Sequence, residues 1–160
     1  MMKGNRWFRY LFWILVIELI GGCSGLMIAD DIRIWRVMAI PAPLTPPSYV
    51  FPVVWGILYG LMGISLARVR MEPESPLRAK AIRLFAVQLF LNFFWGPIFF
   101  STQAYGFALI WLIAMVLYIV SMIRAFLKLD RAAGLLQIPY LIWSVFASYL
   151  NAAVWFLNRK

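Results

Sequence analysis

Four polar side chains stand out in this sequence because each interrupts a long apolar run: Glu18, Gln88, Asn92 and Asn151. An ionised carboxylate inside a membrane costs about 2.5–3.5 kcal/mol or more, so Glu18 is expected to be protonated, paired or hydrated. Amide groups in the same surroundings need hydrogen-bond partners and should point inward. These residues could shape a pocket with a few polar edges, and Glu18 could take part in proton-linked chemistry.

Other residue types limit the chemistry further. The chain has no histidine and a single cysteine, Cys23. It therefore lacks the commonest metal ligand and general base, which is also the usual axial ligand of haem. No nucleophile–base pair, metal cluster or nucleotide-binding loop is evident. We expect no metal site and no required cofactor, and any redox chemistry would belong to a bound ligand.

Large aromatic residues share helical faces with the amides. Three such faces are predicted, each from residues spaced three or four apart. The first comprises Phe51, Trp55, Tyr59 and Met62, the second Gln88, Asn92, Trp95 and Phe99, and the third Pro139, Trp143, Ala147 and Asn151. A pocket lined in this way suits a flat, mostly apolar ligand with some polar edge.

The elements that carry these faces are membrane helices. The chain is 64% hydrophobic and only 13% charged, with a mean hydropathy of +0.85, which a soluble domain of 160 residues could not bury. Five apolar spans fit the chain, at about residues 10–29, 47–69, 79–100, 105–127 and 132–157. We predict an all-α membrane protein, a five-transmembrane-helix bundle that forms one domain over residues 1–160.

The connection before the second span is rich in proline. Thr45 could cap the helix, with proline at its first position, where the missing N–H has no partner in any case. Pro52 would then cost a backbone hydrogen bond, which a membrane helix tolerates when neighbouring helices cover the gap. The linker from Asp30 to Pro46 is the longest in the chain and is expected to carry no span.

The basic residues predict the orientation of the bundle. The net charge is +9, but the lysines and arginines flank the apolar spans instead of forming a nucleic-acid-binding patch. Eleven lie on the side of the N-terminus and four on the other side; Lys3 is among the eleven and Lys160 among the four. For an inner membrane, the N-terminus is therefore predicted to be cytoplasmic and the C-terminus to lie opposite.

The first span also resembles a lipoprotein signal. Basic residues, an apolar run and Ile20-Gly21-Gly22-Cys23 would place Cys23 where such proteins are lipidated. Glu18 disfavours this reading because it would lie inside the signal's apolar region. Four further spans would also make a lipid anchor redundant. We therefore favour the interpretation that the glycines of this motif are small residues that allow close helix packing.

Three motifs carry a resemblance to a known family. They are PPSYVFPVVWGILYGLMG in the second span, QLFLNFFWGPIFF in the third and PYLIWSVFASYLN in the fifth. In this order they resemble the tryptophan-rich sensory protein/translocator protein (TspO/MBR, peripheral-type benzodiazepine receptor) family over nearly the whole chain. Trp35 in the first linker is also at the position expected for that family.

The resemblance implies a ligand and its site. Family members bind porphyrins, notably protoporphyrin IX, and other hydrophobic small molecules, and the resemblance also implies a homodimer in the lipid bilayer. By motif position, Trp55 and Trp143 match pocket tryptophans, and Asn92, Trp95 and Ala147 match other lining positions. The full set of predicted ligand-binding residues is Trp35, Phe51, Trp55, Tyr59, Gln88, Asn92, Trp95, Phe99, Trp143, Ala147 and Asn151.

The sequence also departs from the family pattern. The first linker, WRVMAIPAPLTPP, has Leu44 where the family usually has a second tryptophan, so the cover of the pocket is altered. Ala152 follows Asn151, where animal members have the tyrosine of a proposed cholesterol motif. Sterol recognition through that weak motif is therefore not expected.

Three functions remain open at this stage. The first is a tetrapyrrole receptor, sensor or carrier in porphyrin homeostasis. The second, implied by the family, is light- and oxygen-dependent porphyrin degradation with Trp55 and Trp143 as electron donors. The third is a proton-coupled transporter that uses Glu18, although the sequence lacks the internal repeat typical of such proteins. Of the two interpretations of Glu18, we favour a protonated acid that bridges two helices over a proton-linked role.

Overall fold

The computed structural model describes residues 5–159, and all regular structure in that range is helical. The helices, in chain order, are α1 (Arg6–Met27), α2 (Ala29–Met38), α3 (Val50–Met71), α4 (Pro76–Gly96), the π-helix η1 (Pro97–Ser101), α5 (Tyr105–Leu129), α6 (Arg131–Leu135) and α7 (Ile138–Asn158).

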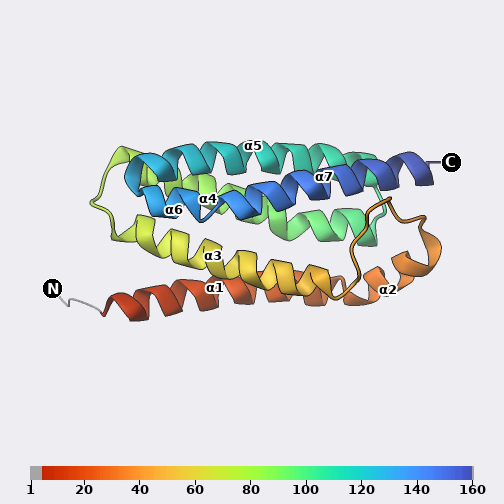
Figure 1. The fold of residues 1–160 in the computed structure, drawn as a ribbon, viewed down its shortest axis with the longest axis horizontal. Coiled ribbons are helices and arrows are strands. Elements are labelled where there is room, and N and C mark those ends of the chain that lie inside the picture. Colours follow the sequence, from red (N-terminus) through yellow and green to blue (C-terminus); the bar gives the residue numbers. More distant parts are fainter. Residues whose placement is uncertain (1–4, 160) are drawn as a thin grey trace.

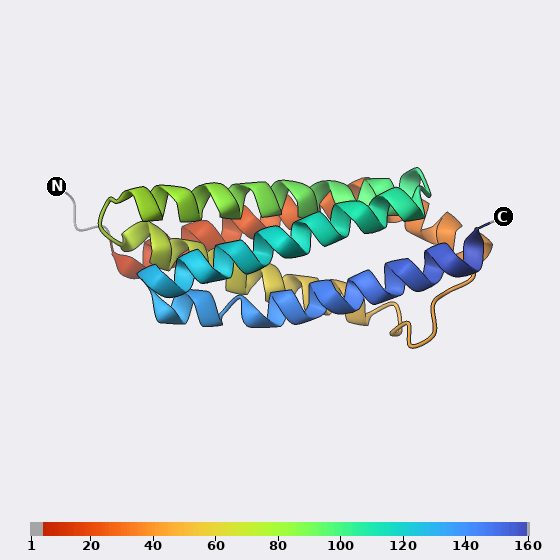
Figure 2. The ribbon, with the colours of Figure 1, turned by 90° about the horizontal axis from the view of Figure 1, so that it is seen from above.

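The long helices lie roughly parallel to one axis and form an elongated bundle (Figures 1 and 2). α1 packs along α3, α4 packs along α5, and α5 packs along α7. The backbones of α3 and α7 approach each other only slightly, so side chains fill the space between them. The N-terminal end of α1 and the C-terminal end of α7 lie at opposite ends of the bundle (Figure 1).

Among residues 5–159, five helical segments are long and apolar enough to cross a membrane, which confirms the predicted fold class. They are Arg6–Met27, Val50–Met71, Pro76–Ser101, Tyr105–Leu129 and Arg131–Asn158. The third and fifth are composite. Pro97 lacks the N–H that would continue α-helical pairing, and the chain continues as η1. In the fifth, α6 ends at Leu135 and α7 begins at Ile138.

The predicted start of the second span was wrong. α3 begins at Val50, and Thr45 caps no helix, because its hydroxyl donates to the carbonyl of Ala42 at 2.6 Å within a turn. Pro52 is consequently the third residue of α3. The N–H groups of a helix's first turn have no intrahelical partner, so Pro52 removes no such bond and the predicted cost does not arise.

The long first linker contains an unpredicted helix. α2 has Asp30 and Asp31 in its first turn and Arg36 in its last, which complement the helix dipole. It also places the Trp35 ring 5.7 Å from that of Phe99 and 5.5 Å from that of Phe100. The linker therefore packs on the end of the bundle instead of running as an open loop.

Two glycines bring α1 close to α3. A Cβ added at Gly63 would lie 2.5 Å from the Cα of Ile14, so only glycine allows this backbone contact. A Cβ added at Gly21 would overlap the ring of Tyr59. The predicted small-residue packing is therefore present at Gly21, where it makes room for a tyrosine of the candidate site. By contrast, a Cβ at Gly22 would meet no atom within 4 Å.

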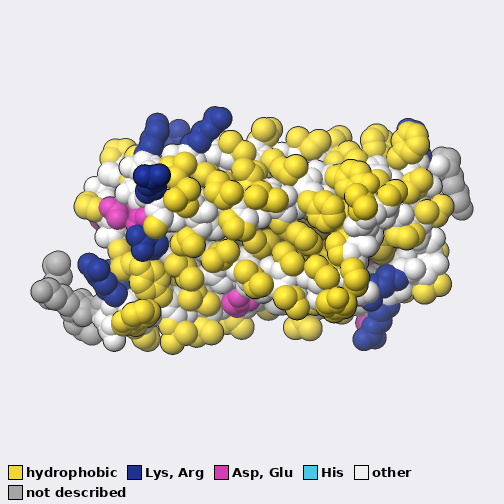
Figure 3. Space-filling model, viewed as in Figure 1, with side chains coloured by type: hydrophobic (Ala, Val, Ile, Leu, Met, Phe, Trp, Pro, Cys, Tyr) yellow, Lys and Arg dark blue, Asp and Glu magenta, His cyan; other side chains and the backbone are white. Residues whose placement is uncertain are grey.

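The surface separates charge from apolar area. Lysine and arginine side chains gather toward the ends of the face shown in Figure 3, and hydrophobic side chains cover the length between them. This pattern suits a bundle surrounded by lipid between two polar boundaries. Lys3 and Lys160, which entered the orientation count, lie outside the described residues, and the orientation stays a prediction.

Candidate ligand-binding site

A cluster of uncharged polar side chains lies buried in the middle of the bundle. We call it the neutral cluster; it consists of Tyr59, Gln88, Asn92 and Tyr140, all less than a tenth exposed. The Tyr59 hydroxyl donates to Asn92 Oδ1 at 2.8 Å, and Asn92 Nδ2 donates to the Tyr140 hydroxyl at 3.1 Å. That hydroxyl donates to Gln88 Oε1 at 2.8 Å. The cluster thus links α3, α4 and α7 without a formal charge.

Two polar atoms, one in this cluster and one on α7, have no hydrogen-bond partner within the described part of the chain. They are Gln88 Nε2 and Ser144 Oγ, and both side chains are fully buried. Leaving a buried donor unpaired costs about 1–3 kcal/mol, so each is a candidate for contact with a ligand. These atoms would supply the polar edge that the sequence predicts for the pocket.

Aromatic rings line the space between α3 and α7, which we call the α3–α7 seam and define by Phe51, Trp55, Trp143 and Ala147. Trp55 stacks on Tyr59 with ring centroids 5.4 Å apart. Phe51 meets Trp143 edge-on at 5.8 Å. All four seam residues are half-buried, whereas the neutral cluster below them is closed. The seam is therefore the more accessible part of the site.

The other predicted residues form a second cluster near η1. Trp95 Nε1 donates to Asn151 Oδ1 at 3.1 Å, and Asn151 Nδ2 donates to the carbonyl of Tyr105 at 2.8 Å. Trp95 also stacks on Phe99 at 5.2 Å, and the ring of Trp35 lies 5.7 Å from the same phenylalanine. The structure therefore divides the predicted ligand-binding residues into two groups, with Trp95 in contact with both. Their role in ligand binding stays a prediction.

The predicted face of the fifth span needs a correction. Pro139 is exposed and Trp143 and Ala147 are half-buried, whereas the buried positions of α7 are Tyr140, Ser144, Asn151 and Val154. The inward face is thus rotated by about one residue from the predicted stripe. Sequence reasoning missed Tyr140, although the amides of the third span required buried partners and the tyrosine follows Pro139 directly.

The three amides point inward as predicted, with exposed fractions of 0% for Gln88, 7% for Asn92 and 1% for Asn151. Glu18 is half-buried and faces α3: a Cβ added at Gly60 would lie 3.5 Å from its Oε1. Within residues 5–159, no lysine or arginine lies at ion-pair distance from this carboxylate. Without an ion-pair partner, the Glu18 carboxyl group must be protonated or hydrated where it lies in the membrane.

Two hydrogen-bonding side chains of α7 hold the linker that follows α2. Asn158 accepts from the backbone N–H of Ile40 at 2.8 Å and donates to the same residue's carbonyl at 2.9 Å. The Tyr149 hydroxyl donates to the carbonyl of Pro43 at 3.2 Å. Although the linker lacks the tryptophan expected at Leu44, it is fixed to the end of α7 and leads directly into the seam.

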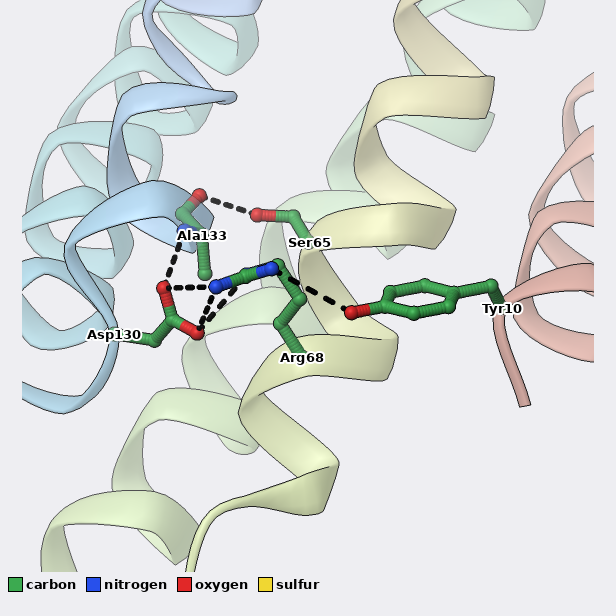
Figure 4. Close-up of polar contacts among 5 residues, drawn as sticks. All are labelled: Tyr10, Ser65, Arg68, Asp130 and Ala133. Carbon is green, nitrogen blue, oxygen red and sulfur yellow. Dashed lines mark hydrogen bonds and ion pairs between the residues drawn. The ribbon is translucent and has the colours of Figure 1, made fainter. Parts of the chain in front are cut away.

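An ionic cluster, drawn in Figure 4, lies toward the end of the bundle opposite η1, where α3 ends and α6 begins. Arg68 Nε and Nη2 contact Asp130 Oδ2 at 2.9 and 2.8 Å, and Arg68 Nη1 donates to the Tyr10 hydroxyl at 3.5 Å. Asp130 also caps α6 by accepting from the Ala133 N–H at 3.0 Å, and Ser65 donates to the Ala133 carbonyl. Sequence reasoning missed this cluster because its members are far apart in the chain.

Burial by itself would raise the pKa of Asp130. Hydrogen bonds from the Ala133 N–H and from Arg68 outweigh that effect, together with the positive charge of Arg68. The pKa of Asp130 therefore lies below its ordinary value of 3.8.

Known proteins match this chain over most of its length. Residues 13–156 match the model of the TspO/MBR family. The tryptophan-rich protein TspO of Chlorobaculum tepidum is 39% identical over 139 residues, covering 86% of this chain and 88% of the relative. The tryptophan-rich sensory protein of Cereibacter sphaeroides is 38% identical over 151 residues, covering 91% and 92%. The translocator protein of Bos taurus is 32% identical over 127 residues, covering 78% and 75%.

Proposed function

The chain belongs to the TspO/MBR family, and from this premise we propose that it binds a tetrapyrrole such as protoporphyrin IX in the membrane, as a receptor, sensor or carrier in porphyrin homeostasis. The observation that carries the proposal is the α3–α7 seam, in which half-buried aromatic rings lie above the buried neutral cluster. Two buried polar atoms are unpaired there within the described residues, Gln88 Nε2 in the cluster and Ser144 Oγ on α7. A flat macrocycle with polar substituents complements both parts.

The ligand is expected to stack on rings of the seam. Trp55 and Trp143 would contact its faces, and Gln88 Nε2 and Ser144 Oγ would donate to carboxylate or carbonyl groups at its edge. The chain has no histidine, so we propose a metal-free porphyrin without axial ligation. The small backbone contact between α3 and α7 favours entry along this seam, where side chains can move without breaking helix packing.

Fluorescence quenching by protoporphyrin IX in the dark tests this proposal. Wild type should quench saturably, and Trp143→Phe should bind several-fold more weakly because it removes the larger ring from the seam. Trp7→Phe is the matched control, because Trp7 is 78% exposed and far from the neutral cluster in sequence and helix position. Equal binding by Trp143→Phe and Trp7→Phe, or no saturable quenching at all, would overturn the proposed site.

Illumination of the same samples tests the second function, degradation of the bound porphyrin. It is favoured by the stacking of Trp55 on Tyr59, since two oxidisable rings in contact could donate an electron to a photoexcited ligand. A new absorbing product that needs light and oxygen and is lost in Trp55→Phe would establish this activity. Binding without such a product would leave a receptor or carrier.

Two further elements of the proposal have their own tests. A homodimer predicts twice the protein mass in detergent, measured by light scattering with the detergent subtracted. Proton-coupled transport predicts a ligand-dependent proton flux in proteoliposomes that Glu18→Gln abolishes. If the flux is absent, Glu18 is a structural acid at the α1–α3 contact.

A further inference from the structure

A cavity of about 230 Å³ lies between α1 and α3, at the end of the bundle where α1 begins. Its walls are Arg9 and Trp13 from α1 and Ala67, Arg70 and Met71 from α3. Arg9 and Trp13 are four residues apart and so share one face of α1. One helical turn before Ala67, Gly63 brings the two backbones together. The cavity is thus the place where the close α1–α3 contact opens toward the membrane boundary.

The positive charge of this cavity is held in place. The Arg70 guanidinium lies over the Trp13 ring, 4.7 Å from its centroid. Such cation–π contact fixes the plane of the guanidinium while leaving its N–H donors free to bind an anion. Arg9 is exposed on the other helix, so the cavity has a guanidinium from each side.

Two of the acidic residues near this end have other partners, whereas Glu72, which follows the lining residue Met71, forms no ion pair within residues 5–159, so the two arginines of the cavity outnumber one nearby carboxylate. Asp130 is bound to Arg68, and Glu74 lies 3.6 Å from Arg78. Within the described part of the chain, neither Arg9 nor Arg70 forms an ion pair. Two arginines over an apolar floor of Trp13, Ala67 and Met71 are therefore complementary to an anion that also carries an apolar portion.

We propose that Arg9, Trp13 and Arg70 form a binding site for a phosphate group, distinct from the porphyrin site. The two guanidiniums hold the phosphate oxygens through charge-assisted hydrogen bonds. Basic pockets between membrane helices at a polar boundary bind phospholipid head groups in this way, and acyl chains would follow the apolar surface of α1 and α3. The same chemistry would also accept a free phosphate or pyrophosphate ion.

The test compares wild type with Arg9→Ala/Arg70→Ala, both purified in a neutral maltoside detergent. Native mass spectrometry would count phospholipid adducts during titration with phosphatidylglycerol and with phosphatidylcholine. The matched control is Arg83→Ala/Arg124→Ala, which removes the same charge from two exposed residues toward the same end but outside the cavity. We expect about tenfold weaker phosphatidylglycerol binding for the cavity variant and little change for the control.

A second titration distinguishes the source of the phosphate. Calorimetry with pyrophosphate, in detergent without lipid, should show binding that the cavity variant loses if a free anion can occupy the site. Selective loss of phosphatidylglycerol binding without pyrophosphate binding would assign the site to a lipid head group. If both double variants bind both ligands equally, or wild type binds neither, the proposal is wrong.

Two further variants, one that preserves the charges and one that removes the Trp13 ring, distinguish a loss of the binding site from a loss of stability. Arg9→Lys/Arg70→Lys keeps both charges but loses the planar, two-pronged donor geometry, so it should bind at an intermediate strength. Trp13→Leu leaves Arg70 without its ring contact and should also bind more weakly. Thermal unfolding in lipid-free detergent would show that the variants are folded. Unaltered binding by all of these variants would overturn the proposed geometry.

Discussion

The neutral cluster and the ionic cluster join helices by opposite means. In the neutral cluster, phenol and amide groups of Tyr59, Asn92 and Tyr140 bind one another midway along the bundle, and no charge is involved. In the ionic cluster, Arg68 and Asp130 form a two-pronged ion pair at the end of the bundle (Figure 4). The difference follows the surroundings: a charge can be placed near the polar boundary, whereas the apolar interior favours neutral donors and acceptors.

The two clusters also serve different helices. The neutral cluster joins α3, α4 and α7 beside the seam, where a ligand would be recognised. The ionic cluster joins α1 and α3 to the α5–α6 connection, and its Asp130 carboxylate also caps α6. We therefore expect the ionic cluster to determine stability and the neutral cluster to affect ligand binding as well.

The largest effect is expected from Asp130→Ala. The substitution leaves Arg68 without its carboxylate and α6 without its cap, which should lower the free energy of unfolding by about 2 kcal/mol. Chemical unfolding in detergent would measure it. Asp30→Ala is the matched control, because its pair with Arg33 is highly exposed and should contribute little. Equal effects of the two variants would contradict the role given to the ionic cluster.

A smaller stability loss, about 1 kcal/mol, is expected from Asn92→Leu. This substitution removes the bonds to Tyr59 and Tyr140 but keeps a side chain of similar volume. A double-mutant cycle with Tyr59→Phe should show that the two losses are not additive, because both variants remove the same bond. Additive losses would mean that the hydrogen bond contributes nothing. Asn92→Leu should also weaken protoporphyrin IX binding, whereas Asp130→Ala should not.

Lowering the pH should reduce the stability contributed by the ionic cluster more than that contributed by the neutral cluster. The pKa of Asp130 is lowered by folding, so its contribution to stability is complete above the unfolded pKa and is lost as the pH falls through the lower, folded pKa. Between about pH 5 and about pH 2, wild type should therefore lose more stability than Asp130→Asn, which has no carboxylate to protonate at this position. Identical pH profiles would rule out this linkage. Asn92→Leu should follow the wild-type profile.

The smallest effect is expected from Tyr10→Phe. The bond from Arg68 to the Tyr10 hydroxyl is long, at 3.5 Å, and the arginine keeps both contacts to Asp130 without it. The loss should be below about 0.5 kcal/mol. A loss as large as that of Asp130→Ala would show that Tyr10, and with it α1, contributes to the ionic cluster far more than this geometry indicates.

Much of the architecture could be predicted because it follows from local composition. Long apolar runs identify the membrane helices, and the cost of an unpaired amide predicts that Gln88, Asn92 and Asn151 point inward. Helix ends were less predictable. Thr45 and Pro46 have a typical helix-start pattern, but the linker packs against the bundle and α3 begins only at Val50.

Contacts between distant segments could not be predicted from local pattern. Arg68 and Asp130 are separated by 62 residues, and nothing in either neighbourhood identifies the other. The rotation of α7 that buries Tyr140 in place of Trp143 is likewise determined by packing against α5 and by hydrogen bonds to α4, since both residues lie within one apolar segment.

Hydropathy and motif order were enough to predict a five-span helical membrane protein of the TspO/MBR family, because both depend only on the residues along each helix. Packing of the helices against one another determined which faces meet. It placed Tyr140 between two amides, divided the predicted ligand-binding residues between the seam with its neutral cluster and the group near η1, and left a basic cavity between α1 and α3. The physical reason is that an inward face depends on helix rotation and neighbouring helices, neither of which a periodic pattern specifies.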